Sequence, residues 1–134
     1  MTSYLLDTSA LLALRDDEPG AERVAALLEA AARGELACHG CFMSQMELLY
    51  RVWKDEGEAA GRMAYSQCLR LPISWLHESP ELLERAAAIK TCLPLSLADA
   101  WIAAATLQLD STLVHKDPEF EKVADLKQEN LPYK

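Results

Sequence analysis

Two acidic side chains of this sequence stand at the junction between a predicted strand and a predicted helix. Asp7 follows the apolar run of residues 4–6 and precedes an apolar segment that is compatible with a helix. Asp117 follows the short run of residues 112–115 and precedes Pro118, and proline is favoured in the first turn of a helix. In open parallel sheets, ligands gather at the carboxyl ends of the strands. Both carboxylates are therefore expected where such a fold carries its chemistry.

Two further acids stand early in predicted helices. Glu47 lies three residues after Ser44, and Asp99 lies three residues after Ser96. This spacing is typical of a capping box, in which a serine and an acid satisfy free N–H groups of the first helical turn. An acid near a helix N-terminus also gains roughly 0.3–1 kcal/mol from the helix dipole. Asp7 and Asp117 stand at the N-cap position of the helices that follow them. Taken singly, each of the four acids is therefore explained by a structural role at a helix N-terminus.

Convergence of the four acids would indicate a metal site. If the helices start at the carboxyl ends of neighbouring parallel strands, their N-termini point into one crevice. Carboxylates gathered there repel one another and take up protons unless a cation offsets their charge. Mg²⁺ prefers oxygen ligands, and a carboxylate-held pair of metals about 3.5–4 Å apart is a known geometry for phosphodiester hydrolysis. The residue types therefore favour metal-assisted chemistry on a phosphate ester.

Strands and helices alternate along the chain. The expected strands are residues 4–6, 36–42, 71–76 and 112–115, with a weak fifth strand within residues 126–131. The expected helices are residues 8–14, 21–33, 44–53, 58–69, 80–90 and 96–109, with a short helix after Asp117. This alternation predicts a parallel sheet covered on both faces. We expect one domain over residues 1–134, a three-layer α/β/α fold with a central parallel sheet of four to five strands.

Composition and charge narrow the class of protein. The chain has 134 residues, of which 51% are hydrophobic, and no apolar run approaches the roughly 18 residues of a transmembrane helix. It also lacks the basic and apolar pattern of a signal peptide, so we expect a cytoplasmic protein that does not bind membranes. The formal net charge of −8 argues against unaided binding to nucleic acid. A metal site or a basic protein partner would weaken that objection.

The four acids lie in four short motifs, which are Leu5-Leu6-Asp7-Thr8-Ser9-Ala10, Ser44-Gln45-Met46-Glu47-Leu48-Leu49, Leu97-Ala98-Asp99-Ala100-Trp101-Ile102-Ala103-Ala104-Ala105 and Thr112-Leu113-Val114-His115-Lys116-Asp117-Pro118-Glu119-Phe120. These motifs resemble those of PIN-domain ribonucleases. Each motif is weak alone, but their order and spacing fit across essentially the whole chain. The length and the compact form look most like the VapC-type toxins of bacterial and archaeal toxin–antitoxin modules.

This resemblance implies a Mg²⁺- or Mn²⁺-dependent endoribonuclease that is the toxin of a type II toxin–antitoxin pair. Asp7, Glu47, Asp99 and Asp117 would form the metal-binding and catalytic set, with Asp7 and Asp99 as the most direct ligands. The implied partners are an RNA substrate and a cognate antitoxin, whose basic segment would occupy the acidic crevice. The resemblance also implies a homodimer.

One position departs from the family pattern. His115 stands where PIN domains usually have a small hydroxyl residue, which can support a water-mediated metal contact. His115 would replace that contact, bind phosphate, or serve as a strand-end histidine hydrogen-bonded to the backbone. Arg51, Lys54 and Lys116 are the best candidates for steering RNA phosphates toward the crevice, although solvated surface charge is the simpler explanation for Lys54.

Other functions have weaker support in the sequence. Cys38 and Cys41 form a Cys-x-x-Cys pair, but a zinc site needs a second pair of ligands and a redox motif is expected at a helix N-terminus. We expect buried thiols there. Two alternatives remain within the PIN-like class, a non-catalytic protein-binding module and a DNA-directed nuclease. Cation binding and cleavage of RNA against flap or duplex DNA would separate them.

Overall fold

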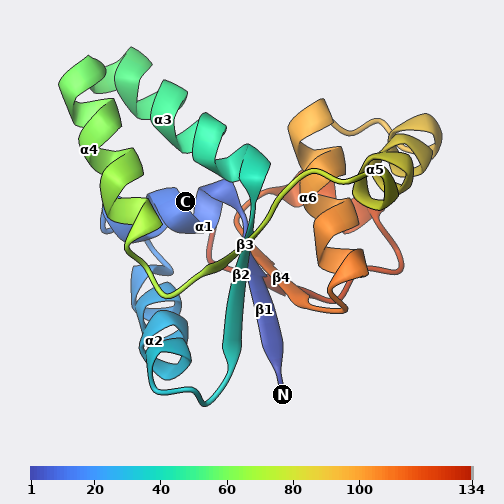
Figure 1. Cartoon of the computed structure of the whole chain (residues 1–134), viewed down its shortest axis with the longest axis horizontal. Coiled ribbons are helices and arrows are strands. Elements are labelled where there is room, and N and C mark those ends of the chain that lie inside the picture. Colours follow the sequence, from blue (N-terminus) through green and yellow to red (C-terminus); the bar gives the residue numbers. More distant parts are fainter. Residues whose placement is uncertain (134) are drawn as a thin grey trace.

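The computed structural model describes residues 1–133, which form a sheet between two layers of helices (Figure 1). Lys134, the last residue of the predicted domain, lies outside the described residues. The strands are β1 (Ser3–Leu6), β2 (Ala37–Cys41), β3 (Ser74–Leu76), β4 (Thr112–His115) and β5 (Gln128–Asn130). The helices are α1 (Thr8–Arg15), α2 (Ala21–Ala32), α3 (Phe42–Glu56), α4 (Glu58–Leu69), α5 (Pro80–Cys92), α6 (Leu97–Gln108) and the 3₁₀ helix η1 (Pro118–Lys122).

All strand pairs are parallel, and the order across the sheet is β3-β2-β1-β4-β5. The prediction of a parallel sheet of four to five strands is therefore confirmed. From β1 the chain first extends the sheet through β2 to β3, and it then returns to place β4 on the other side of β1. The direction of the winding reverses between β1 and β4. In open α/β sheets, such a switch point forms the crevice in which ligands bind.

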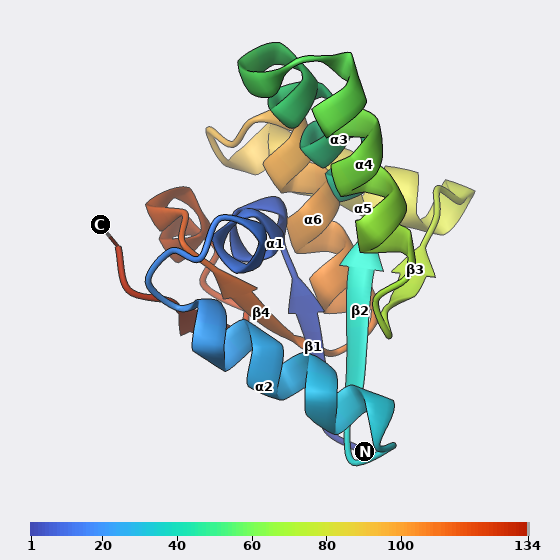
Figure 2. The same cartoon turned by 90° about the vertical axis from the view of Figure 1, so that its left-hand side faces the viewer.

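The two faces of the sheet are buried under different helices. Leu5 lies in a core cluster with residues of α5 and α6, whereas Leu6 lies in a second cluster with residues of α1 to α4. Successive side chains of a strand point to opposite faces, so β1 contributes to both cores. Figure 1 shows α1 to α4 on one side of the sheet and α5 and α6 on the other, and Figure 2 shows α1 and α2 across the first side. The three-layer α/β/α prediction is confirmed.

Helix starts agree with the sequence patterns except at α3. Ser79 and Ser96 are N-caps whose hydroxyls accept hydrogen bonds from the backbone N–H groups of Leu82 and Asp99. The prediction that Ser44 opens its helix is wrong, because α3 begins at Phe42 without a side-chain cap. Phe42 packs edge-on against Trp101, with ring centroids 5.1 Å apart. This tertiary burial extends the helix beyond the start that the capping pattern indicates.

A tryptophan and a glycine fit together where β2 meets β3. A Cβ atom at Gly40 would lie 2.4 Å from Cζ3 of Trp75, which is closer than real Cβ atoms approach other groups. The missing side chain therefore makes room for the Trp75 ring, which explains a glycine in the middle of a strand. None of the helices in residues 1–133 is both long and apolar enough to span a membrane.

Candidate active site

Asp7 is positioned by the turn that joins β1 to α1. It is the N-cap of α1, and its Oδ1 accepts a hydrogen bond of 2.8 Å from the backbone N–H of Ala10. The Ser9 hydroxyl lies 2.7 Å from Asp7 Oδ1 and 2.9 Å from Oδ2, and it also accepts a hydrogen bond from the Lys116 backbone N–H. Asp7 is 3% exposed. The side chain is thus a buried cap, and Ser9 ties it to the segment after β4.

Glu47 is held by a hydroxyl from the same turn. The Thr8 hydroxyl donates to Glu47 Oε1 at 2.6 Å and lies 2.9 Å from the hydroxyl of Ser44. Ser44 and Thr8 are both buried. Because α3 begins at Phe42, Glu47 lies beyond the first three positions of the helix and is not part of a capping box. The hydrogen bond from Thr8, rather than helix capping, therefore orients the Glu47 side chain.

Asp99 and Asp117 approach the crevice from the other side of the switch point. The Ser96 hydroxyl caps α6 through the backbone N–H of Asp99, which leaves the Asp99 carboxylate half-buried in the first turn. Asp117 is the N-cap of η1, and its Oδ1 accepts a hydrogen bond of 2.9 Å from the backbone N–H of Glu119. The cap prediction for Asp117 is confirmed. This hydrogen bond engages one of its two carboxylate oxygens.

Burial and mutual repulsion raise the pKa of two of the four carboxyls. Burial raises the pKa of Asp7 to about 7, and the charges of Asp117 and Glu47 act in the same direction. Burial likewise raises the pKa of Asp99 to about 8, followed by its hydrogen bond with Asp117 and the charges of the other acids. The other three acids therefore all act on Asp99. The structure brings all four into one electrostatic environment.

The donor set fits a hard divalent cation. All four groups are carboxylates, which are ligands that Mg²⁺ and Mn²⁺ prefer. The causes that lower the pKa of Asp7 are the hydrogen bonds from Ser9 and Ala10, and no basic side chain is among the causes given for Asp7 or Asp99. Within residues 1–133, no three His, Cys, Asp or Glu side chains are gathered closely enough to form a complete metal cluster. The chemistry and the charge of the set fit such an ion.

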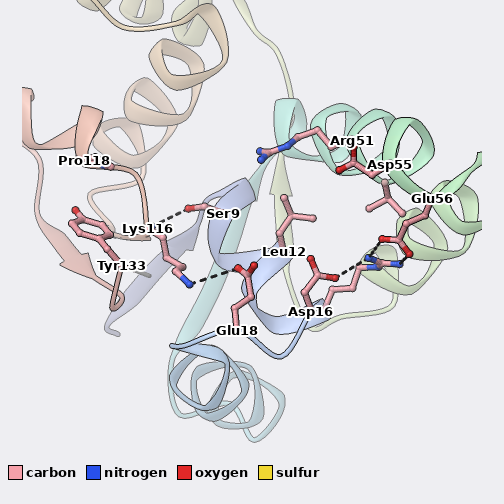
Figure 3. Close-up of a pocket in the computed structure, with 12 residues that line it drawn as sticks. Ser9, Leu12, Asp16, Glu18, Arg51, Asp55, Glu56, Lys116, Pro118 and Tyr133 are labelled. Atoms are coloured by element: carbon pink, nitrogen blue, oxygen red, sulfur yellow. Dashed lines mark hydrogen bonds and ion pairs between the residues drawn. The ribbon is translucent and has the colours of Figure 1, made fainter.

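A cavity of about 600 Å³ lies beside these acids, between α1 and α3 (Figure 3). Ser9 and Lys116 line the end nearest to Asp7 and Asp117, and Figure 3 shows Arg51 reaching from α3 across the cavity. Arg15 and Glu56 form an ion pair, with nitrogen and oxygen 2.8 Å apart, and also line the cavity. Figure 3 shows Glu56 on the side of the cavity away from Lys116. This cavity, called the groove below, begins beside the acids and is lined by Arg51. It is therefore suited to a phosphate-bearing chain.

The three predicted cations differ in their surroundings. The Lys116 ammonium donates to the carbonyl of Pro19 at 2.9 Å and lies 3.6 Å from Glu18, and its side chain is only 8% exposed. Lys116 therefore anchors the loop between α1 and α2. Arg51 lines the cavity, whereas Lys54 is exposed and is not among the lining residues. Of the three, Arg51 has the geometry for contact with a substrate.

Residues 4–126 match the family model of the PIN domain. The chain belongs to the PIN-domain family. PIN domains are nucleases that generally use divalent metal ions. The match spans all four acidic motifs, which agrees with the resemblance noted from the sequence.

Solved structures of VapC-type proteins share the fold of this PIN domain. It is similar to VapBC2 from Rickettsia felis bound to a promoter DNA fragment, with a TM-score of 0.79, 19% identity and coverage of 98% of this chain and 100% of the other. VapBC-1 from nontypeable Haemophilus influenzae gives a TM-score of 0.75, 22% identity and coverage of 96% and 98%. The sarcin–ricin loop cleaving toxin VapC20 of Mycobacterium tuberculosis gives 0.70, 16% identity and coverage of 90% and 94%. No curated protein matches in the sequence comparison.

The Cys-x-x-Cys pair takes no part in the site of this PIN domain. Cys38 and Cys41 are free, buried thiols, and burial raises the pKa of each to about 11. Thiols of this kind are neutral and unreactive at physiological pH. The expectation of buried thiols is confirmed.

Two polar residues beside the acids were given no role in the site by the sequence. Ser44 appeared as a helix cap, but its buried hydroxyl contacts Thr8 instead. Gln128 in β5 contacts His115, with Oε1 and Nε2 2.8 Å apart. The Ser-x-x-Glu pattern could have pointed to Ser44, whereas the sequence around Gln128 carries no signal of this contact.

Proposed function

We propose that this PIN domain is a metal-dependent endoribonuclease and the toxin of a type II toxin–antitoxin pair, acting in the cytoplasm. The observation that supports the activity best is the gathering of four carboxylates at the switch point of the sheet, where burial and repulsion raise the pKa of Asp7 to about 7 and of Asp99 to about 8. Such a set is stabilised when a divalent cation replaces the protons.

Each residue of the site has a role in this proposal. Asp7 and Asp99 would be the direct ligands of Mg²⁺ or Mn²⁺, and Glu47 and Asp117 would complete the set directly or through water. When bound, such an ion would supply an activated water and shield the negative charge that develops on the phosphate. The hydroxyls of Ser9 and Thr8 hold two of the carboxylates in orientation. Where Glu47 and Asp117 do not bind the ion directly, they would orient the attacking water.

Arg51 binds the RNA backbone in the groove between α1 and α3. The guanidinium is exposed and lines the cavity that begins at Ser9, beside Asp7. A bidentate arginine–phosphate contact would place the chain over the carboxylates. RNA would therefore reach the site along the groove shown in Figure 3.

The proposed protein partner is an antitoxin with a basic segment. The structures from Rickettsia felis and Haemophilus influenzae are described as VapBC assemblies. The formal net charge of −8 and the acids at the end of the groove favour a cationic segment over unaided nucleic acid. Such a segment would compete with both metal and RNA. A homodimer, carried over from the family resemblance, is part of the proposal and is tested by sedimentation of the purified chain.

Substitution of the two buried acids tests the activity. Asp7→Asn and Asp99→Asn should each reduce cleavage of single-stranded RNA by at least about 100-fold, because each removes a charged ligand of the ion that would shield the transition state. Both variants should keep the helical circular dichroism of the wild type. Asp125→Asn, an exposed acid outside the motifs, is the charge-matched control and should cleave normally.

Titration with Mn²⁺ in a calorimeter completes this test. The wild type and Asp125→Asn should bind the ion, and chelator should stop cleavage. Full activity in both Asp7→Asn and Asp99→Asn would overturn the proposal. A wild type that neither binds Mn²⁺ nor cuts RNA would point to the protein-binding module, and preferred cleavage of flap or duplex DNA would point to the DNA-directed nuclease.

A further inference from the structure

His115 is fully buried at the end of β4, and both of its ring nitrogens are engaged. Nδ1 lies 3.0 Å from the backbone nitrogen of Asp117 and accepts its N–H. Nε2 lies 2.8 Å from Oε1 of Gln128 in β5. The ring therefore connects one of the four acidic residues to the edge strand of the sheet.

The network around Gln128 selects one tautomer of the ring. The Gln128 Nε2 donates to the carbonyl of Phe120 at 2.8 Å, which turns its Oε1 toward His115. A carboxamide oxygen only accepts, so Nε2 of His115 must carry the proton and donate it. Nδ1 is then bare and is able to accept from the Asp117 N–H. The contact with Asp117 thus depends on a residue 13 positions further along the chain.

The same two side chains hold the segment that carries Asp117. The His115 ring packs against the ring of Phe120, with centroids 5.1 Å apart and planes at 55°. Phe120 is fully buried in η1, and its carbonyl is the one that Gln128 binds. The start of η1 is therefore fixed at Asp117 by His115 and at Phe120 by Gln128. A fixed start matters because Asp117 is close enough to Asp99 to act on its carboxyl group.

We propose that His115, held in one tautomer by Gln128, is a positioning residue that aims Asp117 into the acidic site. This inference rests on the proposed function, because the role of Asp117 as a metal-binding group is part of it. His115 does not contact the metal or the RNA: its ring is fully buried and both nitrogens are already bonded. A small hydroxyl residue at position 115 is too short to link Gln128 to the Asp117 backbone.

Three variants separate positioning from packing. His115→Asn retains an acceptor close to the place of Nδ1, whereas His115→Gln puts its amide where Nε2 lies and loses the acceptor for the Asp117 N–H. Gln128→Leu removes the group that selects the tautomer. Gln108→Leu is the matched control, since Gln108 is a partly buried amide at the opposite end of α6 from Asp99 and its buried oxygen has no partner within the described residues.

We expect cation affinity to fall in the variants that lose the hydrogen bond to the Asp117 backbone. Mn²⁺ affinity should fall about tenfold in His115→Gln and Gln128→Leu, as for other residues that orient metal ligands, and less in His115→Asn. Gln108→Leu should bind Mn²⁺ like the wild type. In cleavage assays kcat should fall while KM for RNA stays unchanged, because Asp117 acts on the ion rather than on the RNA chain.

Nitrogen-15 NMR of the His115 ring in metal-free wild type gives a measurement that needs no activity. The spectrum should show a protonated Nε2 and a bare Nδ1, and Gln128→Leu should mix the two tautomers. A protonated Nδ1 in the wild type would overturn the inference, as would unchanged Mn²⁺ affinity in folded His115→Gln. A wild type with the expected tautomer that binds no Mn²⁺ would overturn the proposed function and the metal-directed part of this inference together.

Discussion

Two adjacent hydroxyl residues support two different acids in this site. Ser9 contacts the carboxylate of Asp7, and Thr8 donates to Glu47, so the short Asp-Thr-Ser segment organises half of the acidic set. Both hydroxyl groups act in a region where water is scarce, since Asp7 and Thr8 are each 3% exposed. Hydrogen bonds made there are hard to replace by solvent.

Replacing Thr8 by valine should disturb Glu47 without changing the shape of the core. Val has nearly the same size but leaves Glu47 and Ser44 without the hydroxyl partner, which should cost about 1–2 kcal/mol of unfolding free energy. RNA cleavage should fall about tenfold or more, as when an orienting partner is lost. Urea denaturation and single-turnover cleavage measure the two effects. Thr8→Ser keeps the hydroxyl and is the control, and normal cleavage by Thr8→Val would show that Glu47 needs no such support.

Helix α3 connects the acidic site to the groove beside it. The helix begins at Phe42, directly after β2, and this start places Glu47 toward Thr8 and Arg51 along the cavity. Lys54, one turn further along from Arg51 on the same helix, is outside the cavity lining. The two cations therefore offer a comparison in which charge and helix are constant and position alone differs.

Arg51→Gln should weaken RNA binding, and Lys54→Gln should not. In an Asp7→Asn background, which prevents cleavage, Arg51→Gln should reduce the slope of log affinity against log salt by about 0.7, the value for one lost phosphate contact on a single strand. Fluorescence anisotropy over a range of salt concentrations measures that slope. Equal effects of the two substitutions would mean that general surface charge, rather than the groove, attracts RNA.

For the whole molecule, assembling the acids at one switch point has a cost in stability. Burial and repulsion raise the pKa of Asp7 from 3.8 to about 7, so the folded protein binds a proton that the unfolded chain has released. The contribution of this group to stability is complete below pH 3.8 and is lost as the pH rises through about 7. Asp99 also stabilises the folded protein at low pH, and because its pKa is about 8 its contribution is lost at a higher pH than that of Asp7.

The metal-free protein should therefore lose stability as the pH rises from about 4 to 8. For Asp7 alone the loss is up to about 4 kcal/mol, since one pKa unit corresponds to about 1.36 kcal/mol. Urea denaturation in chelator at several pH values measures it. Added Mg²⁺ should restore stability at pH 8, and Asp7→Asn should have a shallower pH dependence than the wild type. Equal pH profiles in the wild type and Asp7→Asn would contradict the raised pKa.

Local patterns in the sequence were sufficient for the fold and for the identity of the acids. Alternating strand and helix signals predict the parallel sheet, and the signals at Asp7, Ser96 and Asp117 predict caps that the structure contains. These predictions succeed because backbone conformation and the apolar faces of elements depend mainly on residues close together in the chain. The order of the strands at the switch point then brings the four acids together.

Tertiary structure alone decided which partners hold those acids. Thr8 hydrogen-bonds Glu47, which is 39 positions away in the chain, and Gln128 in another strand selects the tautomer of His115. The local pattern at Ser44 indicated a cap, and burial of Phe42 overrode it. Side-chain hydrogen bonds between distant elements depend on how the elements pack, which no local pattern encodes. The sequence thus identifies the acidic residues of the site, whereas the orientation and the pKa values of their side chains depend on packing.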